Sequence, residues 1–438
     1  MNDLTQLINS ALSKELHALI YLLGYQAQKG SFKVYAVGGF VRDLLLGKEN
    51  RDIDLVVDGN AVEFAKSMLP ALPGRLQSYE RFGTAKLLLS NGIVFDMVTA
   101  RTEFYSAPGA LPTVEQSTLK NDLFRRDFTI NTMACALNPE GFGKLYDYFG
   151  GMDDLEKGII RVLYNLSFVD DPLRILRAVR FEQRFDFTID EDSLSLLHKA
   201  RRGRLLEKVS KERLYKETRL FFREPLPGKV LTRLEELKLF NSIFPRLIFD
   251  RETKERIGRL DLLLPVFGIE RSEHILDNLV LYLSALFYEL SEHDLGYFFY
   301  LMRLKKTERL KIVNILSSLP EILPQIRTPY IKRSHLYSLL EKLPPEGLAL
   351  IICLEDDIVV SEHVIYYWEH LSGRKPFITG KDLLEAGMMP GPLINQILTR
   401  LQDAVLDGKV YGREEELEFV TYLLENNSLI GRAVKGDR

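Results

Sequence analysis

The chain has 438 residues, of which 46% are hydrophobic and 27% are charged, and its formal net charge is −3. This length exceeds what one compact core accommodates, so several domains are expected, and the composition is that of an ordinary globular protein. No apolar run approaches the roughly 20 residues that span a bilayer, and the amino terminus lacks the basic stretch and cleavage site of a secretory signal.

The chain contains only two cysteines, Cys135 and Cys353. They lie far apart and lack the spacing of metal ligands, which disfavours a disulfide scaffold or a thiolate zinc site. We therefore expect a protein of the reducing cytoplasm. Cys135 falls within the apolar stretch INTMACAL, where a buried thiol is expected.

The first predicted element is an amphipathic helix at the amino terminus. Its apolar residues recur at intervals of three and four, which is the helical period. The residues on this stripe are Leu4, Ile8, Leu12, Leu16, Leu19 and Leu23.

Residues 31–150 alternate between expected strands and helices. The runs KVYAV and DLVV are short and rich in β-branched residues, whereas AVEFAKSMLPAL has a helical period. Asn91-Gly92 separates the strand-like runs TAKLLLS and IVFDMVTA, and this dipeptide is a strong hairpin signal. The pattern predicts a domain that mixes strands and helices.

A glycine pair precedes the first helix of this region. Gly38 and Gly39 allow close backbone approach, and the helix that begins near Phe40 would direct its amide groups toward an anion. Arg42 and Asp43 lie in the first turns of the same helix. A nucleoside triphosphate is expected here, so both glycines, Arg42 and Asp43 are candidate nucleotide-binding residues.

Two aspartates one residue apart follow this helix. If Arg51 to Val57 is extended, Asp52 and Asp54 project from the same side of a strand. Close carboxylates repel each other unless a cation lies between them, and carboxylate oxygens suit Mg²⁺. Asp96 on the next hairpin supplies a third acid, and three carboxylates can hold two metal ions for phosphoryl transfer. We predict all three as catalytic and Asp52 and Asp54 as metal ligands; a polar turn is the alternative for those two alone.

The second half of the chain has a different pattern. Residues 102–120 contain Gly109 and two prolines and are expected to form a long functional loop. From about residue 160 almost every segment has helical periodicity, interrupted by prolines such as Pro320. Basic residues concentrate in Arg201–Arg219 and Arg303–Lys311. These clusters are either solvated helix faces or contacts for a phosphate backbone.

Three motifs occur together in the first half: VGGFVRDLLLG with RDIDLVV, then RRDFTINTMA, then DDPLRILRAVRF. In this order and spacing they resemble the class II tRNA nucleotidyltransferase family, which includes bacterial poly(A) polymerases. The segment ITGKDLLEAGMMPGPLINQIL resembles the carboxy-terminal tail of that family. The resemblance implies an α+β fold: a DNA polymerase β-like nucleotidyltransferase head (1–155), then an all-helical neck (156–225), body (226–330) and tail (331–438).

The RRD motif offers groups that suit a nucleotide. Arg126 is a fork-shaped donor, Asp127 an acceptor and Asn131 an amide, and the matching family motif is assigned to the triphosphate and the ribose 2′-hydroxyl. The alternative interpretation is a helix start with Asp127 as its N-cap.

The stretch DDPLR suggests how a base is selected. Asp171 and Arg174 are three apart and are expected on one helical face. A carboxylate accepts from an exocyclic amine and a guanidinium donates to a ring nitrogen, so this base-selecting pair suits cytosine and adenine and rejects uracil and guanine. The family usually has Glu where Asp170 stands. A plain i,i+3 ion pair is the alternative.

Further charged residues follow on the neck helices. Arg177 and Arg180 continue the helix of the base-selecting pair and are expected to contact phosphates or to brace that pair. Arg213 and Glu217 match another family motif, and an i,i+4 ion pair between them is the favoured interpretation.

The predicted function is template-independent addition of CCA to the 3′ end of tRNA, from CTP and ATP, with two Mg²⁺ ions and release of pyrophosphate. Three alternatives stay open: an enzyme that adds only the terminal A, a poly(A) polymerase, and a non-catalytic tRNA-binding protein. The loop at 102–120 resembles the flexible loop that the family associates with adding the terminal A, which argues against CC-only addition. The expected partners are tRNA and nucleoside triphosphates, without a membrane.

Overall fold

The computed structural model describes residues 3–48, 50, 52–72, 74–268 and 276–426. Its contacts divide the chain into two compact units, Met1–Leu247 and Ile248–Arg438. Arg51 of the predicted strand and the last residues of the predicted tail, 427–438, lie outside the described residues. The finer domain boundaries at 155, 225 and 330 stay predictions. No described helix is both long and apolar enough to cross a membrane.

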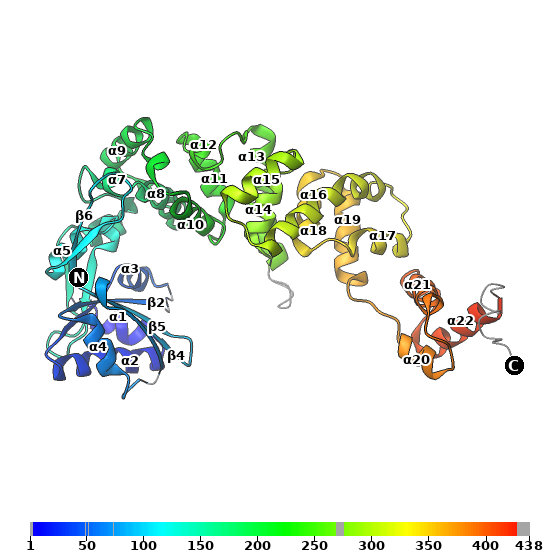
Figure 1. The fold of residues 1–438 in the computed structure, drawn as a ribbon, viewed down its shortest axis with the longest axis horizontal. Helices are drawn as coiled ribbons and strands as arrows, with labels where there is room; N and C mark the ends of the chain where they lie inside the picture. The colour runs from blue at the N-terminus through cyan, green and yellow to red at the C-terminus, as the bar shows by residue number, and fades with distance from the viewer. Residues whose placement is uncertain (1–2, 49, 51, 73, 269–275, 427–438) are drawn as a thin grey trace. The chain divides into compact units, whose positions relative to one another are not determined.

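The first unit contains a seven-stranded sheet with strand order β3-β4-β5-β2-β1-β8-β9. Figure 1 labels its strands β2, β4 and β5. Its strands are β1 (Lys33–Val37), β2 (Asp52–Asp58), β3 (Gly74–Tyr79), β4 (Thr84–Leu89), β5 (Val94–Thr99), β8 (Met133–Ala136) and β9 (Leu145–Asp147). The central pair β2 and β5 is parallel, whereas β4 and β5 form the antiparallel hairpin predicted at Asn91-Gly92. Gly92 has the positive φ, 84°, that such a turn requires.

Helices cover this sheet and leave part of one face open for a site. α2 (Lys14–Lys29) packs against α4 (Ala61–Met68), which contacts β4 and β5. α5 (Leu119–Phe124) packs through Leu119 and Leu123 on the sheet residues Val37 and Val56. Asp54 is two residues before Val56 on β2, so its side chain lies on the sheet face that carries α5.

The amino-terminal segment forms two helices rather than one. α1 (Thr5–Ala11) ends before Ser13, and the Ser13 hydroxyl accepts a hydrogen bond from the amide of Leu16 at the start of α2. This N-cap ends the continuous helix that the apolar period predicted. The stripe itself is confirmed at Ile8 and Leu23, which are buried.

Residues 101–121 are more ordered than the sequence indicated. β6 (Arg101–Phe104) pairs with β7 (Thr113–Gln116) as an antiparallel ribbon. The predicted loop is therefore reduced to the connection 105–112 and a short link before α5. Gly109 in that connection has φ of 76°, a conformation that favours glycine.

Helices follow the sheet within the first unit, as predicted. They are α6 (Gly151–Glu156), α7 (Ser167–Asp170), α8 (Leu173–Phe185), α9 (Glu191–Arg202), α10 (Lys211–Phe221), α11 (Pro227–Glu236) and α12 (Phe240–Ile243). The short strands β10 (Ile159–Ile160) and β11 (Thr188–Ile189) pair beside α8. α8 packs against α10 and α11 and is the central element of this group.

All of the regular secondary structure among the described residues of the second unit is helical. Its elements are α13 (Arg251–Gly268), α14 (Asn278–Leu286), α15 (Glu292–Leu301), α16 (Lys306–Ile326), α17 (Arg333–Leu340), α18 (Pro345–Leu354), α19 (Ile358–Tyr366), α20 (Gly380–Glu385), α21 (Pro392–Leu406) and α22 (Gly412–Asn426). Pro320 lies inside α16 and does not end it, contrary to the sequence expectation. The last three helices share an apolar cluster that includes Leu383, Leu401 and Val420. Cys135 of the first unit and Cys353 of the second are buried free thiols.

Candidate active site

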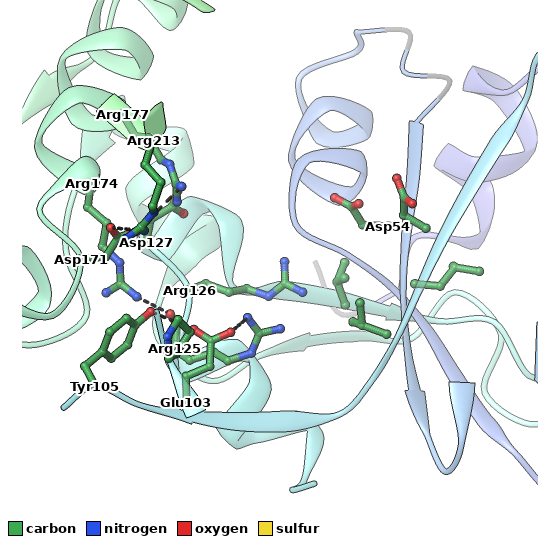
Figure 2. Close-up of a pocket in the computed structure, with 15 residues that line it drawn as sticks. Asp54, Glu103, Tyr105, Arg125, Arg126, Asp127, Asp171, Arg174, Arg177 and Arg213 are labelled. Carbon is green, nitrogen blue, oxygen red and sulfur yellow. Dashed lines mark hydrogen bonds and ion pairs between the residues drawn. The ribbon is translucent and has the colours of Figure 1, made fainter. Parts of the chain in front are cut away.

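A cavity of about 390 Å³ lies in the first unit, between the sheet face of Asp54 and the helices α8 and α10 (Figure 2). This volume is within the usual range for small-molecule sites. Its lining residues are Val37, Asp54, Leu55, Asp96, Val98, Glu103, Tyr105, Pro112, Arg125, Arg126, Asp127, Asp171, Arg174, Arg177 and Arg213. One cavity thus brings together acids from two strands, the RRD motif and the predicted base-selecting pair, Asp171 and Arg174.

The carboxylates at one end of the cavity come from the parallel strands. Asp54 on β2 lies directly opposite Asp96 on β5 in the strand register. Desolvation by the surrounding cavity raises the pKa of the Asp54 carboxyl. The negative charges of Asp96 and Asp52 raise this pKa further, and the positive charge of Arg126 lowers it. Asp52 lies two residues earlier on β2, is exposed and does not line the cavity. Its predicted catalytic role stays a prediction.

A lysine that the sequence analysis did not consider contacts the third acid. Lys86 on β4 forms an ion pair with Oδ2 of Asp96 at 2.9 Å, and the two residues are cross-strand partners. The hydrogen bond to Asp96 raises the pKa of Lys86. One oxygen of Asp96 is therefore already engaged.

The donors at this end suit a hard cation. Asp52 and Asp54 share a strand face. The pKa of Asp54 is raised first by desolvation and then by repulsion from Asp96 and Asp52, and a bound cation would offset both effects. Among the described residues, no three acidic, histidine or cysteine side chains gather closely enough to hold a metal ion unaided. Mg²⁺ is commonly held by one or two carboxylates together with substrate phosphates, and this donor set fits that mode of binding.

Gly38 is needed because Arg126 lies against it. Gly38 has φ of 66°, and a Cβ built there would lie 2.6 Å from Nη1 of Arg126 and 3.7 Å from Oδ2 of Asp54. Asp122 holds the Arg126 guanidinium by an ion pair of 3.2 Å. Gly39 begins the short helix α3 (Gly39–Leu45). The predicted triphosphate site thus has a guanidinium beside the glycine pair.

Arg42, Asp43 and Asn131 lie behind the cavity rather than in its lining. The buried Arg42 donates to Asp43 at 2.7 Å and to Oδ1 of Asn131 at 2.6 Å. Asn131 in turn donates to Asp127 at 2.9 Å. Burial alone would raise the pKa of Asp127, but Arg177 and the Asn131 hydrogen bond lower it below its usual value. These residues position Asp127, and their predicted contact with nucleotide stays a prediction.

The interpretation of Asp127 as a helix cap is wrong. The turn that follows, Thr129–Asn131, has Phe128 at its N-cap position without a side-chain cap. Asp127 instead directs its carboxylate toward Asn131 and the cavity.

Asp171 and Arg174 both line the cavity, but they do not belong to one helix. Asp171 has φ of −128° and ψ of 95° and lies between α7 and α8. The following Pro172 disfavours helical geometry at Asp171, which explains why the expected shared helical face is wrong. The alternative of an i,i+3 ion pair is also wrong, because the two side chains have different partners.

The partners of Asp171 and Arg174, the predicted base-selecting pair, leave part of each side chain available to a ligand. Oδ1 of Asp171 accepts from Arg213 at 3.1 Å, while its Oδ2 lies 3.8 Å from Arg177. Nη1 of Arg174 donates to Ser167 at 2.7 Å and Nη2 to the carbonyl of Arg125 at 2.6 Å. A guanidinium has five N–H groups, so Arg174 retains donors for a ligand.

The next arginines of α8 divide into one that lines the cavity and one that does not. Arg177 lies 3.8 Å from both Asp127 and Asp171 and 3.4 Å from Glu217. Arg180 is outside the lining and is paired with Glu217 at 3.3 Å and with Glu224. Its contacts match bracing of α8 rather than contact with phosphates. The expected ion pair of Arg213 with Glu217 is wrong, since both residues take other partners.

Two segments match known protein families. Residues 34–161 match the family described as the poly A polymerase head domain, and residues 186–250 match a probable RNA- and SrmB-binding site of polymerase A. The A-adding tRNA nucleotidyltransferase of Geobacter sulfurreducens is 37% identical over 97% of this chain. The A-adding enzyme of Halalkalibacterium halodurans is 31% identical over 95% of this chain and 95% of its own. The chain belongs to the class II tRNA nucleotidyltransferase and poly(A) polymerase family.

Solved structures of this family share the fold. The CCA-adding enzyme of Thermotoga maritima, in complex with a tRNA, matches with a TM-score of 0.76 and 34% identity. The match covers 96% of this chain and 98% of that enzyme. This confirms the predicted class II α+β fold with a polymerase β-like head followed by helices. The chain spans 49% of the length of the Geobacter relative.

The family motifs did not identify every residue that lines the cavity. Arg125, Glu103 and Tyr105 line it, and Glu103 links the other two by accepting from Arg125 at 2.9 Å and from the Tyr105 hydroxyl at 2.9 Å. Arg213 donates to the carbonyl of Gly109 at 2.8 Å. The signals available were the doubled arginine of the RRD motif and the length of the 102–120 segment.

Proposed function

We propose that this class II family member transfers AMP from ATP to the 3′ end of a tRNA that ends in CC. Two relatives that align with nearly the whole chain carry the name A-adding tRNA nucleotidyltransferase, at 37% and 31% identity. They support terminal A addition, one of the alternatives of the sequence analysis, better than the complete CCA addition that it favoured.

The residues that line the cavity support the proposed chemistry. Asp54 and Asp96 lie opposite each other on two strands of the sheet. Asp171 and Arg174 lie on the other side of the cavity, and Arg126 and Asp127 line the same space (Figure 2). A nucleoside triphosphate needs this sequence of groups: an acidic end for its metal-bound phosphates, cationic groups beside them, and hydrogen-bonding groups for its base.

The proposed reaction is an in-line displacement. The 3′-oxygen of the tRNA forms a bond to the α-phosphorus of ATP and its proton passes to solvent, while the bond from the α-phosphorus to the oxygen that bridges it to the β-phosphorus breaks and pyrophosphate leaves. Asp52 and Asp54 would hold Mg²⁺, which would supply a lower pKa for the attacking hydroxyl and positive charge to neutralise the triphosphate. Arg126 contributes a fixed positive charge beside Gly38.

Base selection rests on Asp171 and Arg174. Oδ2 of Asp171 accepts from the exocyclic amine of adenine, and a remaining N–H of Arg174 donates to a ring nitrogen. Guanine and uracil would present a carbonyl oxygen to Asp171 and an N–H to Arg174. Two acceptors would then face each other, as would two donors, and both side chains would be left unpaired. Cytosine presents the same order as adenine, so this pair alone does not separate the two.

Complete CCA addition is the second candidate. It is supported by the similarity to the Thermotoga CCA-adding enzyme over 98% of that enzyme. In either case tRNA contact is expected to involve the neck, where Arg202, Lys208, Lys211 and Lys216 are exposed. Exposed cations of this kind suit an RNA phosphate backbone.

The test uses one tRNA in three forms, ending before CCA, after C and after CC. Each form is incubated with Mg²⁺ and CTP, ATP or both, and the products are resolved on a sequencing gel. Extension of the CC form by one residue with ATP, and no extension of the other two forms, is the expected result. Three-residue extension of the shortest form would establish the second candidate, and long A ladders a poly(A) polymerase. Binding without extension of any form would refute the catalytic proposal.

A further inference from the structure

Tyr164, outside all the motifs of the sequence analysis, lies beside the base-selecting pair. Its hydroxyl is 3.0 Å from Oδ2 of Asp170, to which it donates, and 3.2 Å from Nη1 of Arg174, from which it accepts. The guanidinium carbon of Arg174 lies 5.7 Å from the centre of the Tyr164 ring. The ring itself stacks on Phe124 with centroids 5.3 Å apart.

The two hydrogen bonds have a fixed direction. A carboxylate only accepts, so Asp170 takes the phenol proton, and an arginine only donates, so Arg174 uses a lone pair of the same oxygen. Burial raises the pKa of Tyr164 and Asp170 adds to the increase, while Arg174 opposes it. The phenol therefore keeps its proton at neutral pH and remains a donor to Asp170.

Asp170 contacts Arg174 only through this hydroxyl. Among the described residues no ion pair joins Asp170 and Arg174, and the Asp170 carboxylate is 3.0 Å from the tyrosine oxygen instead. Tyr164 thus connects the carboxylate of Asp170 to the guanidinium of Arg174. The short side chain of Asp170 makes no direct ion pair with that guanidinium. A glutamate at position 170 would be one methylene longer.

The same hydroxyl determines which donors Arg174 has left. Both N–H groups of Nη1 are taken, one by Tyr164 and one by Ser167, and Nη2 gives one to the carbonyl of Arg125. The remaining N–H groups belong to Nη2 and Nε. The guanidinium group is planar. Holding Nη1 on two partners therefore also fixes the plane in which the remaining N–H donors lie.

We propose that Tyr164 is a positioning residue that, together with Asp170, orients the guanidinium of Arg174 for selection of the incoming base. The proposal rests on the nucleotide-binding role of Arg174 in the proposed function. Without the hydroxyl, Arg174 keeps its charge but loses one of the two partners that hold Nη1. Nucleotide binding then survives, while discrimination between adenine and guanine decreases.

The first experiment compares the full chain with Tyr164→Phe, which keeps the stacked ring and removes only the hydroxyl. Incorporation of AMP and GMP into a CC-ending tRNA is measured, and in parallel the equilibrium binding of ATP and GTP without tRNA. We expect the preference for adenine to decrease about tenfold in both, the usual size of one hydrogen bond to a charged group. An unchanged preference would overturn the proposal. If the wild type extends no tRNA, the proposed function fails, and the binding ratios still decide the role of Tyr164.

Two further variants separate orientation from damage to the fold. Tyr148→Phe is the matched control, because Tyr148 belongs to the same aromatic cluster and its hydroxyl has no hydrogen-bond partner among the described residues. It should leave the preference unchanged. The double variant Tyr164→Phe with Asp170→Glu should recover most of the preference, because the longer acid can reach Arg174 directly. Failure of this rescue, with an unchanged melting temperature, would overturn the role assigned to Asp170.

Discussion

Arg213 and Asp171 are joined by an ion pair of 3.1 Å across the wall of the cavity. The same guanidinium donates to the carbonyl of Gly109 at 2.8 Å. A single side chain from α10 thus connects the acid that precedes α8 with the β6–β7 connection. The position of the Asp171 carboxylate therefore depends on the β6–β7 connection as well as on α10.

The first prediction concerns the contacts of Arg213 with Asp171 and with the Gly109 carbonyl. Arg213→Lys keeps the charge but replaces a planar fork by a point charge that does not bridge both partners in the same geometry. We expect kcat/KM for ATP to decrease about tenfold, and further for Arg213→Ala, because a hydrogen-bonded charge is left without its partner. Steady-state kinetics with a CC-ending tRNA measure this.

The matched control is Lys211→Ala, an exposed residue two positions earlier on α10. Its effect on kcat/KM for ATP should be small, although tRNA affinity can decrease. Equal losses of ATP efficiency in the Arg213 and Lys211 variants would mean that Arg213 acts only as a surface charge.

The second prediction concerns the acidic end of the cavity. The pKa of Asp54 is raised in the folded protein, so the folded state holds this proton more tightly than the unfolded state. The resulting stability is complete below the ordinary aspartate pKa and is lost as the pH rises through the raised value. Above the raised pKa, ionised Asp54 therefore destabilises the fold, and we expect activity to appear over the same pH range in which that stability is lost.

Asp54→Asn should consequently abolish nucleotide transfer while slightly increasing the melting temperature at pH 7. Added Mg²⁺ with ATP should raise the melting temperature of the wild type and raise that of the variant much less, since binding to the native state stabilises it. Asp58→Asn, at the exposed end of the same strand, is the control. A variant that melts lower than wild type, or that responds to Mg²⁺ and ATP in the same way, would contradict the assignment of Asp54.

The third prediction compares Gly38 and Gly47, which lie just before and just after helix α3. Gly38 and Gly47 have nearly equal φ values, 66° and 67°, but a Cβ at Gly38 would meet Arg126 at 2.6 Å whereas one at Gly47 would meet nothing within 4 Å. Alanine at either position incurs backbone strain of roughly 1 kcal/mol or more. Only Gly38→Ala should also displace Arg126 and weaken ATP binding. Comparable ATP affinity in the two variants, measured by titration calorimetry, would show that Arg126 is not constrained by Gly38.

The sequence was most informative where the relevant chemistry is local. Asn91-Gly92 encodes its own turn, and the alternation in β2 is enough to place Asp52 and Asp54 on one face. The common cavity of Asp54, Asp127 and Asp171 could be expected only because their motifs resemble one family, since no local rule relates segments so far apart in the chain.

The parts that sequence reasoning missed depend on register and long-range packing. Lys86 contacts Asp96 because of the pairing of β4 and β5, and sequence spacing does not reveal that register. The i,i+4 rule favoured a pair between Arg213 and Glu217, but tertiary partners are closer to each of them. Such pairs contribute only a few tenths of a kcal/mol on an isolated helix, so a buried partner readily replaces them.

The final prediction tests the buried charges behind the cavity. Glu217 is 7% exposed and accepts from Arg177 at 3.4 Å and from Arg180 at 3.3 Å. Glu217→Gln keeps the size of the side chain but leaves two guanidinium groups of α8 with less compensating charge. We expect a loss of about 1–3 kcal/mol in the free energy of unfolding, which is the usual penalty for an unsatisfied buried polar group.

Glu207→Gln is the control, because Glu207 pairs with Arg204 at 2.7 Å on the surface, where both side chains are largely exposed. Surface pairs contribute about 0–1 kcal/mol, so this variant should unfold at nearly the wild-type urea concentration. Urea denaturation followed by circular dichroism compares the two. If Glu217→Gln were no more destabilising than Glu207→Gln, the Arg177 and Arg180 contacts would not hold α8 in place, and the bracing role of Arg180 would have to be abandoned.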